Sequence, residues 1–396
     1  MSRRAGAGKT AITPPLPFQL AGHRGERIAT AIADPLEARA LVVQDHDRLA
    51  AVVSVDLLWL SREQVLRIRA IVEQTTGIPA QAVFVACTHT HSGPDTLDWY
   101  DHAPPISDWR IESLCQSIAS AVYIAAKSLQ PVQVAHAATE VAIGTNRRMR
   151  TAAGMERHPN PDGDIDHSLD VLSFVRPDGG VIATIIRQAT HPVILGAAST
   201  VVSGDWCGEA RRFVETHLGG ACLVFNGTCG DVNPHEWTGA SMDEVRRTGL
   251  RVGCAAVEAA LRPQAPLALD LFVSSRTLRL DPHPHPYLSR AQAKRLTLEA
   301  AMIVEVQALR LGPAVLLGLP GECLTDSGRA IQRAVTGAHA MIVSYANDYV
   351  GYLPSPAVIE EGGYEARTRM LTEDGISELL SAAIDAAREA AAQPRA

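Results

Sequence analysis

Two histidines in the segment 88–94 (THTHSGP) have the type and spacing of a metal-binding or acid–base pair. The segment follows a predicted strand over 81–86, and residues i and i+2 of an extended chain point the same way. His89 and His91 would then face one site before the Gly-Pro pair turns the chain. Imidazoles bind zinc and also transfer protons near neutral pH, so either role fits. The ordinary alternative is a pair of loop histidines bonded to neighbouring carbonyl groups.

Other polar groups also come just past the carboxyl ends of predicted strands. They are His191 before Pro192, Asn233 in GDVNP, Glu322 after a Pro-Gly turn, and Tyr352 with Tyr364 twelve residues later. Each has an ordinary interpretation alone, since a lone histidine is usually structural and a glutamate is favoured at a helix N-terminus. Open α/β sheets place their sites at this edge, so the convergence favours a metal hydrolase.

Strands and helices must alternate to place these groups at one edge. Hydrophobic runs predict strands over 38–44, 49–58, 81–86, 130–143, 168–176, 180–188, 221–226, 268–280, 313–318 and 339–345. Helical patterns cover 62–74, 108–129, 205–218, 242–261, 289–300, 323–336 and 373–392, and 144–167 is polar and irregular. The order predicts an α/β (mixed α+β) fold, with mixed β-sheets flanked by helices and the metal site at strand carboxyl ends.

Composition excludes several classes of function. The 396 residues are 46% hydrophobic and 20% charged with a formal charge of −7, which excludes disorder and disfavours a nucleic-acid partner. No stretch is long and apolar enough for a membrane span, and the N-terminus has no secretory signal, so we expect a cytoplasmic protein. The segment Gly6–Thr10 (GAGKT) lacks the upstream glycine and strand of a phosphate-binding loop.

At these motifs the chain resembles the neutral/alkaline, non-lysosomal ceramidase family, whose zinc-dependent catalytic domain cleaves the N-acyl amide bond of ceramide. THTHSGP resembles the most diagnostic block of the family. Asn146-Arg147 and the blocks at 12–15, 34–41 and 54–57 match in order. The resemblance implies one zinc ion per chain, held by His89, His191, Glu322 and Tyr352. It implies that His91 is a catalytic neighbour of the metal, and that Arg147 and Tyr364 contact the substrate and the oxyanion.

The chain departs from the family pattern at Asn233, where the family has a serine. Asparagine cannot be a nucleophile, but its amide can donate to an oxyanion. We therefore expect a zinc-dependent hydrolase that cleaves the N-acyl amide bond of a small or lipid-like substrate by attack of zinc-bound water. The alternatives are a zinc esterase or lactonase with the same site, and a degenerate member that binds metal or ligand without turnover. We expect residues 1–396 to be one catalytic domain without the C-terminal β-domain of the family.

Two further interpretations concern the surroundings of the motifs. Four carboxylates could orient the ligand histidines, and four cysteines lie close enough to the motifs for a thiol to bind metal or attack a carbonyl. The carboxylates are Asp56, Asp95, Asp205 and Asp231, and the cysteines are Cys87, Cys207, Cys229 and Cys323. The aromatic residues Trp99, Tyr100 and Trp109 would wall the pocket or anchor a surface loop.

Overall fold

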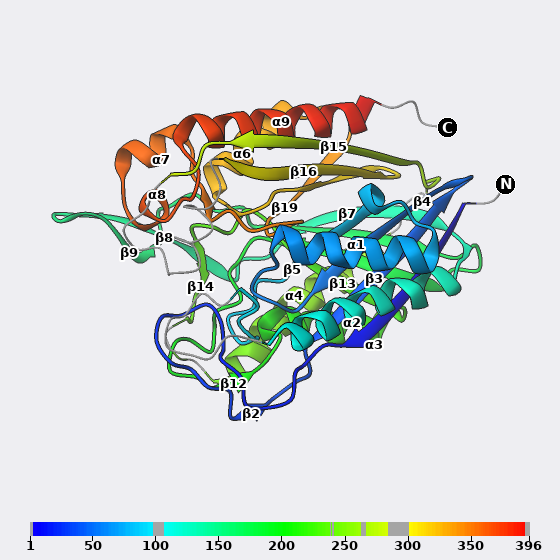
Figure 1. The fold of residues 1–396 in the computed structure, drawn as a ribbon, viewed down its shortest axis with the longest axis horizontal. Coiled ribbons are helices and arrows are strands. Elements are labelled where there is room, and N and C mark those ends of the chain that lie inside the picture. The colour runs from blue at the N-terminus through cyan, green and yellow to red at the C-terminus, as the bar shows by residue number, and fades with distance from the viewer. Residues whose placement is uncertain are drawn as a thin grey trace.

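The computed structural model describes residues 3–97, 107–237, 239, 241–262, 267–283 and 301–392. Two β-sheets share a hydrophobic core, and helices cover their outer faces (Figure 1). A third sheet carries its own covering helices, with a long C-terminal helix along it. This arrangement confirms the predicted mixed α/β class.

The first sheet contains the strand that leads to the THTHSGP segment. Its order is β5-β4-β3-β1-β6, formed by β1 (Arg4–Ala11), β3 (Glu37–Asp45), β4 (Arg48–Val55), β5 (Val83–Cys87) and β6 (Gln130–Pro131). Helices α1 (Arg62–Thr76) and α2 (Asp108–Lys127) cover it, and the short helix η1 (Ala80–Ala82) precedes β5. The predicted hairpin of β3 and β4 is confirmed, and β5 runs parallel to β4.

Strand β1 is absent from the predictions because it contains glycine and alanine where a predicted strand would have branched apolar residues. A Cβ atom at Gly6 or Gly8 would collide with the carbonyl oxygens of Ala125 or Ala121 on α2. The glycines of the GAGKT segment therefore allow a helix to pack closely on the strand. They have a structural role in the core.

The second sheet leads to His191. Its order is β13-β11-β10-β7, formed by β7 (Gln133–Glu140), β10 (Ser168–Val175), β11 (Val181–Gln188) and β13 (Ala221–Asn226). Helices α3 (Asp205–Leu218) and α4 (Met242–Leu261) cover its outer face. Its inner face packs on the first sheet, where the rings of Phe84 and Phe225 meet edge-on with centroids 6.1 Å apart. The ends of β5 in the first sheet and β11 in the second therefore lead to the same region of the protein.

The third sheet has the order β15-β16-β17-β19. Its strands are β15 (Leu271–Leu280), β16 (Met302–Leu311), β17 (Ala314–Gly318) and β19 (His339–Val343). Helices α6 (Thr325–Ala334) and α9 (Glu373–Ala392) pack on it. Strand β16 was not predicted, and the predicted helix over 289–300 lies outside the described residues.

The segment 144–167 is not irregular, so that prediction was wrong. It contains the hairpin of β8 (Gly144–Thr151) and β9 (Gly154–Asn160), and β8 also pairs with β14 (Val232–Pro234). The buried residues Asn146, Arg147 and Arg148 of β8 are polar and stabilised by hydrogen bonds and ion pairs, so no apolar alternation marks the strand. Polar burial of this kind leaves no hydrophobic period to detect.

The remaining elements are short and lie around the strand ends. They are β2 (Ala31–Ile32), β12 (Val201–Val202), β18 (Glu322–Cys323), β20 (Tyr352–Leu353), α7 (Pro356–Glu361) and α8 (Tyr364–Arg367). Of the helices in the described ranges, none combines the length and apolar character that crossing a bilayer demands. Of the expected aromatic wall, Trp99 and Tyr100 lie outside the described residues, and Trp109 is 64% exposed.

Candidate metal centre and active site

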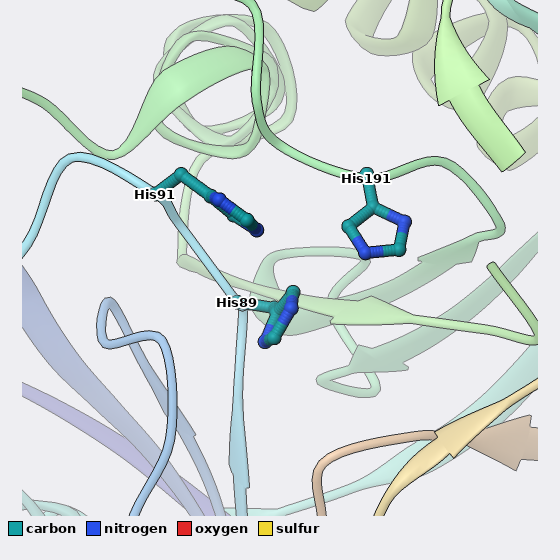
Figure 2. Close-up of side chains that lie close together, drawn as sticks. All are labelled: His89, His91 and His191. Carbon is teal, nitrogen blue, oxygen red and sulfur yellow. The ribbon is translucent and has the colours of Figure 1, made fainter. Parts of the chain in front are cut away.

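Three histidines converge on one point beyond β5 and β11 (Figure 2). His89 and His91 come from the loop after β5, and His191 comes from the loop after β11. Each offers a ring nitrogen, and the three nitrogens lie within 4.8 Å of one another. The structure therefore brings together the histidines from the two motifs.

His89 is not extended, so the reason given for the two histidines sharing a face was wrong. Its φ is 67°, in the left-handed region that non-glycine residues avoid. Backbone hydrogen bonds hold the loop on both sides of it: His89 N donates to Leu57 O at 2.9 Å, and His91 N donates to Pro192 O at 3.1 Å. Strained backbone of this kind persists where surrounding contacts enforce it, and here it directs the His89 ring to the common point.

Glu322, the predicted carboxylate donor, lies beside two of these histidines. Its Oε2 lies 3.0 Å from His191 Nε2 and 3.7 Å from His89 Nε2. Glu322 belongs to β18 and does not open the helix predicted over 323–336, because α6 begins at Thr325. The parallel pairing of β18 with β20 places Glu322 beside Tyr352.

The ring Nδ1 atoms of two of these histidines contact backbone carbonyl groups. His89 Nδ1 lies 2.8 Å from Leu58 O, and His191 Nδ1 lies 2.6 Å from Cys229 O. A carbonyl oxygen only accepts, so each Nδ1 carries a proton. The Nε2 atoms of both rings face a Glu322 carboxylate oxygen, an arrangement that a proton or a metal ion between them satisfies. Two imidazoles and one carboxylate suit zinc with positions left for other ligands.

Burial and charge favour the metal-binding forms of these groups. Burial lowers the pKa of His89 from 6.5 to about 3, so its ring is neutral at neutral pH. Burial alone would raise the pKa of Glu322, but the nearby His89 and the hydrogen bond with His191 lower this pKa to about 2. A neutral imidazole and an ionised carboxylate are the states that bind a metal ion.

Two tyrosines that the sequence analysis did not assign hold Glu322 in place. Tyr349 donates its hydroxyl hydrogen to Glu322 Oε1 at 2.6 Å, and Tyr345 donates to Oε2 at 3.4 Å. The Tyr345 ring also stacks on His89 with centroids 3.8 Å apart. Both tyrosines are buried, and the only sequence signal near them is that Tyr349 lies three residues before the predicted ligand Tyr352.

Tyr349→Phe should weaken zinc binding about 10- to 100-fold, because the Glu322 carboxylate loses the donor that orients it. Turnover at saturating zinc should change much less. Zinc titration of metal-free protein measures the affinity, and Tyr345→Phe, which removes a longer contact, is the matched control. An unchanged zinc affinity in Tyr349→Phe would show that the hydroxyl does not position Glu322.

Arg147 links the other predicted site residues. Its Nη1 donates to Asn233 Oδ1 at 3.0 Å and its Nη2 donates to the Tyr352 hydroxyl oxygen at 2.9 Å. Its Nε donates at 3.0 Å to Glu365, a buried carboxylate that the sequence analysis missed. Burial and the charge of Glu322 keep the pKa of Tyr352 well above 10, so this side chain is a neutral phenol.

Tyr364 lies at the edge of the same network. Its ring centroid is 5.5 Å from that of Tyr352, and the Arg157 guanidinium stacks 4.1 Å from it. The Arg147 guanidinium carbon lies 5.8 Å from the ring. Tyr352, Tyr364, Arg147 and Asn233 therefore form one group next to Glu322.

His23 also belongs to this region, although no motif marked it. Its ring centroid is 5.0 Å from that of His91, and burial lowers its pKa to about 4. Its buried Nε2 has no hydrogen-bond partner within the described ranges, and the same is true of both ring nitrogens of His91. Neutral imidazoles thus line one side of the centre.

The carboxylates and cysteines near the motifs make other contacts. Asp56 pairs with Arg211 at 2.6 Å, Asp231 accepts from Thr325 N at 2.9 Å, and Asp205 accepts from Ile194 N at 3.0 Å. Asp95 accepts from Leu97 N at 3.1 Å. Backbone carbonyl groups orient His89 and His191 instead. Burial raises the pKa of each of the four cysteine thiols, which disfavours a thiolate nucleophile; these are Cys87, Cys207, Cys229 and Cys323.

The sequence of this chain matches a known protein family. A sequence model of neutral/alkaline non-lysosomal ceramidase, N-terminal, matches residues 4–236. The chain belongs to this ceramidase family. Neutral ceramidase B of Dictyostelium discoideum is 26% identical over 227 residues, which are 51% of this chain and 31% of that protein. The chain thus matches about a third of the length of that relative.

Solved structures extend the likeness in fold to nearly the whole chain. The neutral ceramidase from Pseudomonas aeruginosa superposes with a TM-score of 0.82 at 20% identity, covering 98% of this chain and 74% of that one. A ceramidase complexed with C2 gives 0.80 at 21% identity, covering 98% and 75%. Glu322, Tyr352 and Tyr364 lie beyond the residues matched by the ceramidase family model, but within a fold shared with these structures.

Proposed function

We propose that this protein is a zinc-dependent amidohydrolase that cleaves the N-acyl amide bond of a small or lipid-like substrate. The observation that carries the proposal is the convergence of the His89 and His191 Nε2 atoms on Glu322 Oε2. Membership of the ceramidase family supports an amide as the bond that is cleaved. The names of its relatives point to ceramide-like lipids as the first substrates to test.

His89, His191 and Glu322 would hold the zinc ion, with Tyr352 as a fourth ligand through its hydroxyl oxygen. Zinc bound there supplies a Lewis acid that acidifies water and polarises a carbonyl group. The fixed Nδ1 hydrogen bonds of His89 and His191 support their assignment, because ligating histidines usually donate their other N–H to an oxygen. His91 has no such bond among the described residues, so we assign it to the reacting groups.

Arg147 and Asn233 would stabilise the oxyanion of the tetrahedral intermediate. The bonds of Arg147 to Glu365, Asn233 and Tyr352 engage three of its five N–H groups, so donors remain for a substrate oxygen. Because Asn233 Oδ1 accepts from Arg147, its NH2 end is left to donate. Donors held in place before the reaction stabilise developing charge without reorganisation.

His91 would take the proton that the attacking water releases and pass it to the leaving nitrogen. An amine leaves poorly unless it is protonated, so an amide needs this group more than an ester does. The environment of His91 supports the role, since both ring nitrogens are buried and without partners in the described part of the chain. Tyr364, at the edge of the Arg147 network, would contact the substrate.

Asn233 favours a second candidate function. If the family serine matters for amide cleavage, a chain with asparagine would retain activity only on better leaving groups, as a zinc esterase or lactonase. Matched pairs of N-acyl amides and O-acyl esters, with long and short acyl chains, distinguish the two when assayed on zinc-loaded protein. Amide hydrolysis supports the proposal, ester-only hydrolysis supports the second candidate, and retained zinc without hydrolysis shows a binding protein.

His91→Ala should keep its zinc and lose about 100-fold in amide turnover, because the leaving nitrogen loses its proton donor. Turnover of the matched ester should fall less. Elemental analysis measures the zinc content, and the amide and ester assays measure turnover. The control is His217→Ala, because His217 is an exposed histidine on α3. A His91→Ala variant with full amide turnover would contradict this role.

A further inference from the structure

A second cluster of metal-binding side chains lies in another part of the fold. His136 on β7, Asp170 on β10 and His339 at the start of β19 each offer a ligand atom, and these atoms lie within 4.8 Å of one another. His339 begins β19, and Tyr345 of the active site follows its other end, about 20 Å along an extended chain. The cluster shares no residue with the histidine centre.

An ion pair with Arg187 fixes the orientation of Asp170 in this cluster. It is fully buried, and its Oδ2 accepts from Arg187 Nε at 2.6 Å across the β10–β11 pair. Arg187 also donates to Asp166 at 2.9 Å and to the Ser168 hydroxyl at 2.6 Å. These bonds turn Asp170 Oδ1 towards the two imidazoles.

The charges of the buried ion pairs around Asp170 do not balance. One guanidinium, that of Arg187, faces two carboxylates, those of Asp166 and Asp170, so one negative charge remains. Burying an uncompensated charge is unfavourable, and a cation beside Asp170 Oδ1 would neutralise it. A protonated His339 could do so, since its Nε2 lies 2.5 Å from Oδ1.

A proton on His339 would not account for the position of His136. Its Nε2 is buried without a hydrogen-bond partner in the described ranges, and it lies 3.6 Å from Asp170 Oδ1, beyond hydrogen-bond distance. The rings of His136 and His339 are tilted towards each other with centroids 4.3 Å apart. An unpartnered nitrogen that faces a carboxylate and a second imidazole is the arrangement of a metal ligand.

We infer that His136, Asp170 and His339 form a second divalent-metal site that joins two sheets of the fold. The donors select zinc over calcium or magnesium, because imidazole nitrogens bind zinc and the harder ions prefer all-oxygen sites. The His339 side chain is 42% exposed, so the site is open to solvent for loading and for a water ligand. The ion would connect β7 and β10 of the second sheet with β19 of the third.

Zinc stoichiometry tests the inference. Metal-free protein is dialysed against zinc, and bound metal is counted by elemental analysis for the wild type, His339→Ala and His136→Gln. The wild type should bind about two ions per chain, and each variant should lose one. His158→Ala, an exposed histidine 3.9 Å from a carboxylate, is the control and should lose none.

Glu322→Gln separates this inference from the proposed function. Loss of one ion in Glu322→Gln and of another in His339→Ala supports both sites. If His339→Ala and His136→Gln, each folded by circular dichroism, bind as much zinc as the wild type, the second site does not exist. If they lose an ion while Glu322→Gln loses none, the second site stands and Glu322 is not a zinc ligand.

Discussion

Replacement of Glu322 by glutamine should abolish zinc binding at the active site and lower amide turnover about 10⁴-fold, equivalent to about 5.4 kcal/mol of transition-state stabilisation. The substitution keeps the size of the side chain but removes the only carboxylate among the described residues that contacts both His89 and His191. The neutral amide cannot balance the charge of a divalent ion. Elemental analysis after dialysis and the amide assay measure the two losses.

Glu112→Gln is the matched control for this substitution. Glu112 is an exposed carboxylate on α2 that pairs with Arg67, so the same chemical change there should leave zinc content and turnover intact. Normal zinc content and turnover in Glu322→Gln would remove this residue from the centre. Normal zinc with lost turnover would instead make Glu322 a catalytic group and not a ligand.

Arg147→Met should lower amide turnover about 1000-fold and leave zinc content unchanged. The substitution removes the donor to Tyr352 and Asn233 and with it the proposed oxyanion contact. It also takes one of two guanidinium partners from the buried Glu365, so the free energy of unfolding should fall by about 3 kcal/mol. Urea unfolding and steady-state kinetics measure the two effects.

Arg148→Met separates catalysis from stability. Arg148 binds the other oxygen of Glu365 at 2.9 Å and also pairs with Glu361, so its loss should destabilise the protein similarly. Within the described residues its hydrogen bonds reach neither Tyr352 nor Asn233, so turnover should fall far less than in Arg147→Met. Equal turnover losses in the two variants would mean that Arg147 acts only through Glu365.

Sequence patterns predicted most of the elements that are held by apolar contacts, although β16 was missed. The helix over 205–218 and the strand over 221–226 have the bounds that the structure gives α3 and β13, because α3 buries one face and β13 is a continuous buried run. Strands β1 and β8 were missed for physical reasons. The glycines of β1 serve close helix packing, and the arginines of β8 are buried through ion pairs, so neither strand shows a hydrophobic pattern.

The candidate site was predicted best where a motif follows a strand. His89, His91, His191 and Glu322 meet as expected, although His89 does so through a left-handed backbone that the sequence did not indicate. Tyr345 and Glu365 were not assigned because their importance comes from the partners that they meet in three dimensions. A single tyrosine or glutamate carries no spacing signal of that kind.

Anomalous diffraction at the zinc absorption edge, from crystals of zinc-loaded protein, would locate the metal ion. We expect a peak bonded to His89 Nε2, His191 Nε2 and a Glu322 oxygen at about 2.0–2.2 Å, with both Nδ1 atoms still bonded to Leu58 O and Cys229 O. A zinc-loaded crystal without a peak between these residues, or with the ion bound through Nδ1, would contradict this expectation.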